Sequence, residues 1–304
     1  MKFTIGSDPE FMIINSKGQV KSAINILKSP KQKPIQIEQN KFYYDNVLAE
    51  CTIQPSLSKE EFIDNIKKSL KNLSHLIKPY ELKLLAACKF PKEELIHPDS
   101  YVVGCDPEIC AYSMKVIETQ KFENDIRTAG GHIHLEFNFA KTQNGPLFST
   151  RILDLFLGII SNWMDKDPST SIRKKMCGKA GRFRIKEYGL EYRTLSNFWF
   201  ASPQLVSVIY DIIDSIVSLL ENNGYFEYWD FNENNIDWNK KDFNMKNVHI
   251  CKEYNVDMLR NTIDKNIISK EFNCLIEKHL SSKLLNEIQN VINNNYNFYK
   301  EWEL

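Results

Sequence analysis

The stretch AGGHIHLEF at residues 129–137 alternates polar and apolar side chains with a period of two residues. Its apolar positions are Ile133, Leu135 and Phe137, and its polar positions are His132, His134 and Glu136. This alternation predicts a β-strand with one buried face and one face that carries two imidazoles and a carboxylate. Imidazoles bind metals or donate to phosphates, and the preceding Gly130-Gly131 would let a ligand or another backbone approach closely. The alternative is a half-exposed strand with incidental histidines.

Short apolar or β-branched runs on both sides of this strand predict a sheet. The expected strands are Lys2–Ile5, Phe11–Ile14, Phe42–Tyr44, Val47–Ile53, Leu82–Cys88, Val102–Tyr112, Gly131–Phe137, Arg182–Lys186 and Leu190–Leu195. Helices are expected from Ser58 to about Ile77, over Thr150–Met164, and from Pro203 to near Gly224, with helical spacing again from about Val256 and breaks near Ser269 and Ser281-Ser282. Strands first and helices later, without βαβ alternation, predict an α+β fold whose antiparallel sheet has helices packed on one face. No Pro- or Gly-rich linker divides the chain, so we expect one domain over residues 1–304, with a helical part from about residue 203.

The composition argues against several classes of protein. Lys and Arg number 39, as do Asp and Glu, so a globally basic nucleic-acid binder is not indicated. The sequence has no apolar run of about 18 residues, so no membrane span is expected, and its start lacks a secretory hydrophobic region. The seven cysteines form no CxxC pair, which favours reduced thiols in a cytoplasmic protein over disulfides or a zinc finger. P-loop, GxGxxG and GxSxG motifs are absent.

Asp8 and Glu10 stand two residues apart in GSDPEF, residues 6–11. In a strand they would share a face, and their carboxylates would repel one another. A divalent cation such as Mg²⁺, which prefers carboxylate oxygens, would remove that repulsion. A surface turn at Asp-Pro is the alternative. Asp106 and Glu108 repeat the same spacing in GCDPE, and their role stays open.

Glu50 lies in a second apolar run, between Ala49 and Cys51. Burying its carboxylate is costly unless it is paired or bound to a metal, although the side chain could simply reach solvent. Asp45, just upstream, is less diagnostic because it could be a turn residue.

Glu191 and Arg193 in GLEYRTLS, residues 189–196, are again two polar residues spaced two apart, so they would share one face of a strand. The carboxylate could hold a metal while the guanidinium holds a transferring phosphoryl group, or the two could form part of an ordinary salt bridge. Upstream, Arg182, Arg184 and Lys186 fall on one strand face within a basic stretch that runs from Arg173. Such a stretch suits a polyphosphate or a nucleic-acid backbone, and a solvated cationic strand is the alternative.

These segments, taken in order, resemble the phage-type COOH–NH2 ligases (amidoligases) of the glutamine synthetase and γ-glutamylcysteine synthetase-like carboxylate–amine ligase superfamily. The resemblance covers roughly residues 3–200 and lies in GSDPEF, GCDPE, AGGHIHLEF and GLEYRTLSNFW. It implies a curved antiparallel sheet, the glutamine-synthetase-like catalytic fold, whose concave face binds ATP and two or three Mg²⁺ or Mn²⁺ ions.

The resemblance also implies roles for individual residues. The implied metal ligands are Asp8, Glu10, Glu50, His132 and Glu191. The residues implied to lie near the ATP phosphates are His134, Arg182, Arg184 and Lys186, while Arg193, with Arg184, would act on the phosphoryl group. The chain departs from many relatives at the first pair, where they carry two Glu and this chain has Asp8.

The implied activity is ATP-dependent joining of a carboxylate to an amine through an acyl phosphate, with small-molecule or peptide substrates, in the cytoplasm of a bacterial host if the chain is phage-encoded. One alternative is a guanidine-kinase-like phosphotransferase of related fold. The other is a non-enzymatic phage protein that binds nucleic acid through the Arg173–Lys186 stretch. The sequence indicates neither the substrates nor the oligomeric state.

Overall fold

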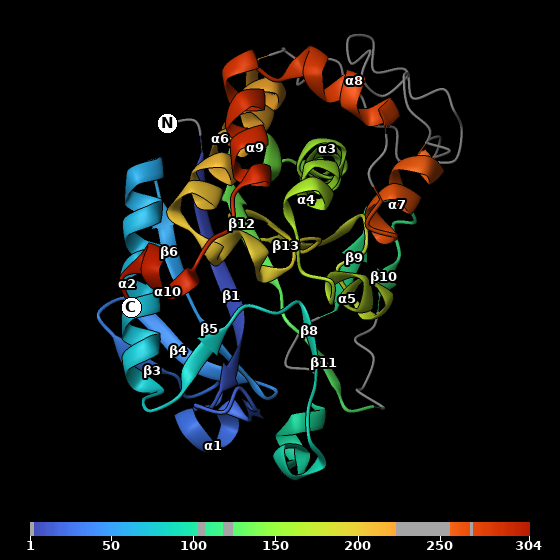
Figure 1. Ribbon diagram of the computed structural model, residues 1–304. Coiled ribbons are helices and arrows are strands. Elements are labelled where there is room, and N and C mark those ends of the chain that lie inside the picture. Colours follow the sequence, from blue (N-terminus) through green and yellow to red (C-terminus); the bar gives the residue numbers. More distant parts are fainter. Residues whose placement is uncertain (1–2, 103–106, 118–123, 223–255, 268–269) are drawn as a thin grey trace.

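The computed structural model describes residues 3–102, 107–117, 124–222, 256–267 and 270–304 (Figure 1). Its strands are β1 (Thr4–Ile14), β2 (Val20–Lys21), β3 (Ile35–Ile37), β4 (Asn40–Asp45), β5 (Leu48–Cys51), β6 (Ile53–Ser56), β7 (Glu81–Lys83), β8 (Ala87–Lys89), β9 (Glu108–Cys110), β10 (Val116–Ile117), β11 (Ile126–Thr128), β12 (Gly131–Glu136), β13 (Arg182–Lys186) and β14 (Gly189–Tyr192). Its α-helices are α1 (Ala23–Leu27), α2 (Lys59–Leu76), α3 (Gly145–Leu153), α4 (Ile159–Met164), α5 (Thr170–Met176), α6 (Pro203–Asn222), α7 (Val256–Asp264), α8 (Lys270–His279), α9 (Ser282–Asn293) and α10 (Phe298–Trp302).

One large sheet organises the fold, with β1 at its centre. The strand order is β10-β9-β13-β14-β12-β1-β5-β4-β3, and β2, β6 and β7 also pair with β1. Each strand pairing in this sheet, and that between β8 and β11, is antiparallel. The predicted α+β class and antiparallel sheet are therefore confirmed.

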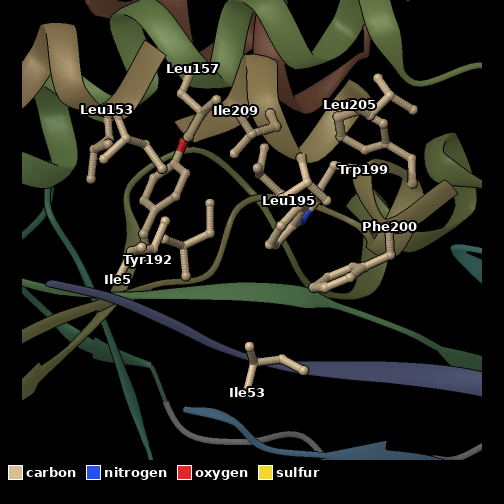
Figure 2. Packing of buried hydrophobic residues seen from close by; sticks show 14 of the residues in the cluster. Ile5, Ile53, Leu153, Leu157, Tyr192, Leu195, Trp199, Phe200, Leu205 and Ile209 are labelled. Atoms are coloured by element: carbon tan, nitrogen blue, oxygen red, sulfur yellow. The ribbon is translucent and has the colours of Figure 1, made fainter. Parts of the chain in front are cut away.

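Helices α3, α4, α6 and α9 gather above β1, β12 and β13 on one side of this sheet (Figure 1). Helix α3 contacts β13 and β14, while α6 contacts α2, α3 and α9. Figure 2 shows the core between these layers, where Tyr192, Leu195 and Trp199 pack beneath Leu157 and Ile209. Each large apolar side chain buried here stabilises the fold by about 1.5–3 kcal/mol.

Helix α6 begins as the sequence predicts, because the Ser202 hydroxyl accepts a hydrogen bond from the N–H of Leu205. Its buried residues recur every three or four positions, at Val206, Ile209, Ile213, Ile216 and Leu220. In the described part of the chain, α6 is the single helix whose length and composition would allow it to cross a membrane, with a mean hydropathy of 1.5 over Pro203–Glu221. Half of that window is buried inside the fold, as in the core helix of a soluble protein, so the expectation that the chain lacks a span stays a prediction.

Several local predictions differ from the structure in instructive ways. Thr4 and Ile5 of the expected strand Lys2–Ile5 are part of the same strand, β1, as Phe11–Ile14, with Pro9 between them, and Lys2 lies outside the described residues. The helix expected over Thr150–Met164 starts earlier, at Gly145, and contains a π-helical turn at Asp154–Gly158. The break predicted near Ser281 separates α8 from α9, whereas the one near Ser269 lies outside the described residues. Four described cysteines are free thiols, as expected: Cys51, Cys88, Cys110 and Cys177.

Candidate functional site

The register of four strands brings the predicted site residues together on the central part of the sheet. Asp8 in β1 is paired with His132 in β12, and Glu10 in β1 is paired with Glu50 in β5. His134 in β12 is in turn paired with Glu191 in β14. The residues between them, such as Ile133, Leu135 and Tyr192, belong to the apolar core. Period-two alternation therefore places the polar side chains on the sheet face opposite that core.

One group of possible metal ligands, which we name the mixed cluster, consists of Asp8, His134 and Glu191. Each offers one ligand atom, and these atoms all lie within 4.8 Å of one another. Oδ1 of Asp8 is 3.1 Å from Nε2 of His134, yet both atoms are buried and neither has a hydrogen-bond partner among the described residues. The other ring nitrogen of His134 shares a hydrogen bond with the hydroxyl of Tyr188, which orients the imidazole.

A second group, the acidic cluster, consists of Glu10, Asp45 and Glu50, again with ligand atoms within 4.8 Å of one another. Oε2 of Glu10 accepts a hydrogen bond of 2.6 Å from the N–H of Gly130. The hydroxyl of Tyr43 donates to Oε1 of Glu50 over 2.7 Å, while Oε2 of Glu50 is buried without a hydrogen-bond partner among the described residues.

Asp45 is the member of the acidic cluster that the sequence did not single out. It ends β4, and β4 pairs with β5 so that Tyr43 lies opposite Glu50. Asp45 is two residues beyond Tyr43 and therefore shares the strand face from which Tyr43 reaches Glu50. The sequence did contain a signal for the hairpin, because Asp45-Asn46 is a pair typical of turns. The structure agrees, since Asn46 has a φ of 58°. What could not be read was the strand register that brings Asp45 to Glu10.

The pKa values show that the acidic cluster is short of positive charge. Burial, followed by the charge of Asp45, raises the pKa of Glu10 to about 7. Burial also raises the pKa of Glu50 well above its usual value, although Lys31, whose Nζ is 3.9 Å from Oε1, opposes the shift. Three buried carboxylates at this distance repel one another, and a divalent cation would neutralise them.

The mixed cluster behaves differently because it contains and adjoins cations. Burial would raise the pKa of Asp8, but the neighbouring His134 and His132 outweigh it, so this pKa lies well below the usual value. Burial would also raise the pKa of Glu191, but the charge of Arg193 outweighs it and the pKa is lowered. Asp8 and Glu191 are therefore ionised, and a metal ion at Glu191 would compete with the cationic side chains that already contact it.

Both clusters fit divalent metal ions. Oε2 of Glu50 is a buried atom without a hydrogen-bond partner among the described residues, whereas Oδ1 of Asp8 already faces two imidazole nitrogens. Oxygen ligands suit Mg²⁺ or Mn²⁺, and an imidazole nitrogen is acceptable to Mn²⁺. His132, predicted as a ligand, has its Nδ1 3.2 Å from Oδ1 of Asp8, and burial followed by the charge of Arg193 lowers its pKa to about 4. It is therefore neutral and able to bind a metal, but the structure places His134 rather than His132 in the mixed cluster.

Positive side chains surround Glu191. Arg193 donates from its Nη1 to Oε1 of Glu191, and Arg184 Nη1 lies 3.1 Å from the same oxygen. Nζ of Lys186 is 2.8 Å from Oε2 of Glu191. Arg182 points instead toward Glu108, with 3.5 Å between its Nε and Oε1 of Glu108. Of the basic residues predicted to bind phosphate, Arg184 and Lys186 thus line one side of the mixed cluster, and Arg182 does not.

The basic stretch from Arg173 to Lys186 is not one solvated surface. Arg173 is buried and donates from Nη1 to the carbonyl of Thr194 over 2.9 Å. Lys174 is buried and donates to the carbonyl of Ile263 over 2.7 Å, and burial lowers its pKa to about 8. Both side chains are buried and donate to backbone carbonyls, so they do not belong to an exposed cationic surface.

A buried aspartate on the helical side, missed from the sequence, supports the strand that carries Glu191. Asp154 accepts hydrogen bonds from the hydroxyls of Tyr192 at 2.7 Å and Tyr112 at 2.9 Å. It also accepts from the N–H of Gly181 and the hydroxyl of Thr194. Burial raises the pKa of Asp154 to about 6 against the effect of these donors. The sequence signal that could have identified Asp154 is its position as the one acid inside the apolar run ILDLFLGII, residues 152–160.

Comparison with known families agrees with the resemblance drawn from the motifs. No curated protein matches the chain. Residues 120–236 match the family described as phage phiEco32-like COOH.NH2 ligase-type 2. The matched segment includes β12, β13 and β14. Strand β1 and the three residues of the acidic cluster precede it in the sequence. Over residues 120–236 the chain is therefore similar to the phage-type COOH–NH2 ligases.

Proposed function

We propose that the protein is an ATP-dependent and metal-dependent carboxylate–amine ligase built on a glutamine-synthetase-like sheet. The observation that carries this proposal is the pairing of the mixed cluster with the acidic cluster on either side of β1, with Arg193, Arg184 and Lys186 alongside. Two cation sites beside a group of arginines suit a reaction that handles the negative charge of a polyphosphate. The ligase family of residues 120–236 supports the choice of carboxylate and amine substrates.

The metal sites would be held by the two clusters, with His132 as a further candidate ligand beside Asp8. Bound Mg²⁺ or Mn²⁺ would supply neutralisation of the phosphate oxygens during transfer. The residues of the chain have complementary tasks. His134, Arg182 and Lys186 would orient the phosphates, while Arg193 and Arg184 would face the charge that develops on the transferring phosphoryl group.

The proposed reaction has two steps. A carboxylate oxygen of the first substrate attacks the γ-phosphorus of ATP, and the bond from that phosphorus to ADP breaks. The product is an acyl phosphate, whose phosphate is a far better leaving group than oxide. The amine of the second substrate then attacks the acyl carbon, phosphate leaves, and an amide forms. We propose small molecules or peptides as substrates and the cytoplasm, which supplies ATP, as the location.

An isotope experiment tests this proposal directly. A panel of carboxylic acids labelled with ¹⁸O, with hydroxylamine as a general amine, would be incubated with ATP and Mg²⁺. The expected result is hydroxamate together with inorganic phosphate that carries one ¹⁸O atom. Glu10→Ala and His132→Ala should lose at least about 100-fold in turnover, whereas Asp64→Asn, an exposed change on α2, should not. A phosphorylated substrate without free phosphate would favour a phosphotransferase, and full turnover by Glu10→Ala would refute the site.

A further inference from the structure

Glu108, the second acid of the repeated DPE motif, contacts two of the arginines rather than either metal cluster. It begins β9, which pairs with β13 so that Arg182 lies opposite Cys110. Oε2 of Glu108 accepts a hydrogen bond of 3.0 Å from Nε of Arg193, and its Oε1 is 3.5 Å from Nε of Arg182. The carboxylate is 14% exposed, so solvent screens these contacts weakly.

We propose that Glu108 is a positioning residue that gives the guanidinium of Arg193 a second carboxylate partner, so that a divalent cation can displace Arg193 from Glu191. This inference rests on the proposed function, because it assigns a task within the mixed cluster. It separates the two DPE motifs by role, since Asp8 and Glu10 of the first belong to clusters of possible metal ligands. Among the described residues, neither such cluster includes Glu108.

The contacts of Arg193 show why such a residue is needed. Its Nη1 donates to Oε1 of Glu191 and lies 3.2 Å from Nδ1 of His132. A guanidinium on Glu191 competes with a metal ion for the same oxygen, because both carry positive charge. The guanidinium is a planar fork, so a hydrogen bond to Nε fixes the orientation of its Nη atoms. Glu108 supplies that bond from the side of the guanidinium remote from the Glu191 contact.

Loss of the Glu108 charge should therefore make Arg193 harder to displace from Glu191. The consequence is weaker metal binding at the mixed cluster, although the variant removes no ligand atom. The acidic cluster, on the other side of β1, should keep its affinity. A direct role of Glu108 as a ligand, or a general loosening of the fold, would not depend on Arg193 in this way.

A double-mutant cycle distinguishes these possibilities. Mn²⁺ would be titrated calorimetrically into wild type, Glu108→Gln, Arg193→Gln and the double variant, each purified without metal. We expect Glu108→Gln to weaken one class of Mn²⁺ site by about 10-fold when Arg193 is present, as is typical of changes behind a ligand. The same substitution should have little effect in the Arg193→Gln background. Glu136→Gln is the matched control, since Glu136 lies on the same strand as His134 but pairs with Lys141.

The outcomes separate this inference from the function on which it rests. An equal loss of affinity in both backgrounds, or no loss in either, overturns the positioning role while the metal site stands. Absence of Mn²⁺ binding by the folded wild-type protein overturns both. Thermal unfolding of each variant shows whether a loss of affinity comes from a loss of fold.

Discussion

Gly130 and Glu10 exchange two hydrogen bonds across the sheet. The N–H of Gly130 donates to Oε2 of Glu10 over 2.6 Å, and the N–H of Glu10 donates to the carbonyl of Gly130 over 3.0 Å. The glycine pair ahead of β12 thus fixes both the backbone and the side chain of an acidic-cluster residue. It also links the two sequence motifs, GSDPEF and AGGHIHLEF, from which the site was predicted.

Alanine substitutions in the glycine pair should separate function from stability. A Cβ at Gly130 would meet the imidazole of His132, so Gly130→Ala should displace that ring and lower turnover by at least about 10-fold. A Cβ at Gly131 would lie 2.6 Å from Nε1 of Trp199 and 2.7 Å from the carbonyl of Ser196. Gly131→Ala should therefore cost about 1–3 kcal/mol of unfolding free energy by overpacking. Steady-state kinetics and thermal unfolding of both variants provide the check, and two identical profiles would contradict it.

Asp45→Asn tests the acidic-cluster member that the sequence missed. Loss of one carboxylate charge should weaken binding of Mg²⁺ or Mn²⁺ at this cluster by about 10-fold or more, because three acids compensate the ion. Calorimetric titration of the metal-free protein measures the change. Asp64→Asn on α2 serves as the control, and an affinity equal to wild type in Asp45→Asn would exclude Asp45 as a ligand.

Asp154 should give the protein an unusual dependence of stability on pH. Its pKa is raised to about 6 in the folded protein from 3.8, so the folded state binds a proton more tightly than the unfolded state between these values. The contribution of Asp154 to stability is therefore greatest below pH 4 and falls as pH rises toward 6, by up to about 3 kcal/mol. Asp154→Asn does not titrate, so the difference in melting temperature between the variant and wild type should change across this window. A constant difference from pH 4 to 7 would contradict the expectation.

Tyr188→Phe should weaken the mixed cluster without unfolding the protein. The Tyr188 hydroxyl is bonded to the ring nitrogen of His134 that faces away from Asp8, and it fixes the orientation of that imidazole. Partners of this kind typically change metal affinity by about 10-fold or more. Mn²⁺ titration should show the loss at one class of site, with the acidic cluster unchanged. Equal weakening of both classes would point to a general effect on the sheet.

The site was predictable from sequence where a pattern is local and not where it depends on pairing. The alternation in AGGHIHLEF specifies which side chains share a face, and the structure places His132 and His134 together as that pattern requires. Asp45 reaches Glu10 only through the register of β4, β5 and β1. Position along a strand cannot reveal such a contact, because register depends on the whole sheet.

Burial was the second source of error. Arg173 and Lys174 look like a cationic surface in sequence, but α5 places them against the carbonyls of Thr194 and Ile263. Glu108 is similar, because its partners Arg182 and Arg193 come from strands that follow it by about seventy residues or more. Whether a charged group meets water, a carbonyl or an opposite charge is decided by tertiary packing, which composition does not encode.

The central strand, β1, sets the distance between the mixed cluster and the acidic cluster. Asp8 belongs to one cluster and Glu10 to the other, with Pro9 between them in β1. Two residues of an extended strand span roughly 7 Å, so the backbone repeat, and not a loop, sets how far apart two bound ions would sit. Surrounding loops can therefore vary in length and sequence without changing that spacing, whereas one residue inserted into β1 would disrupt it.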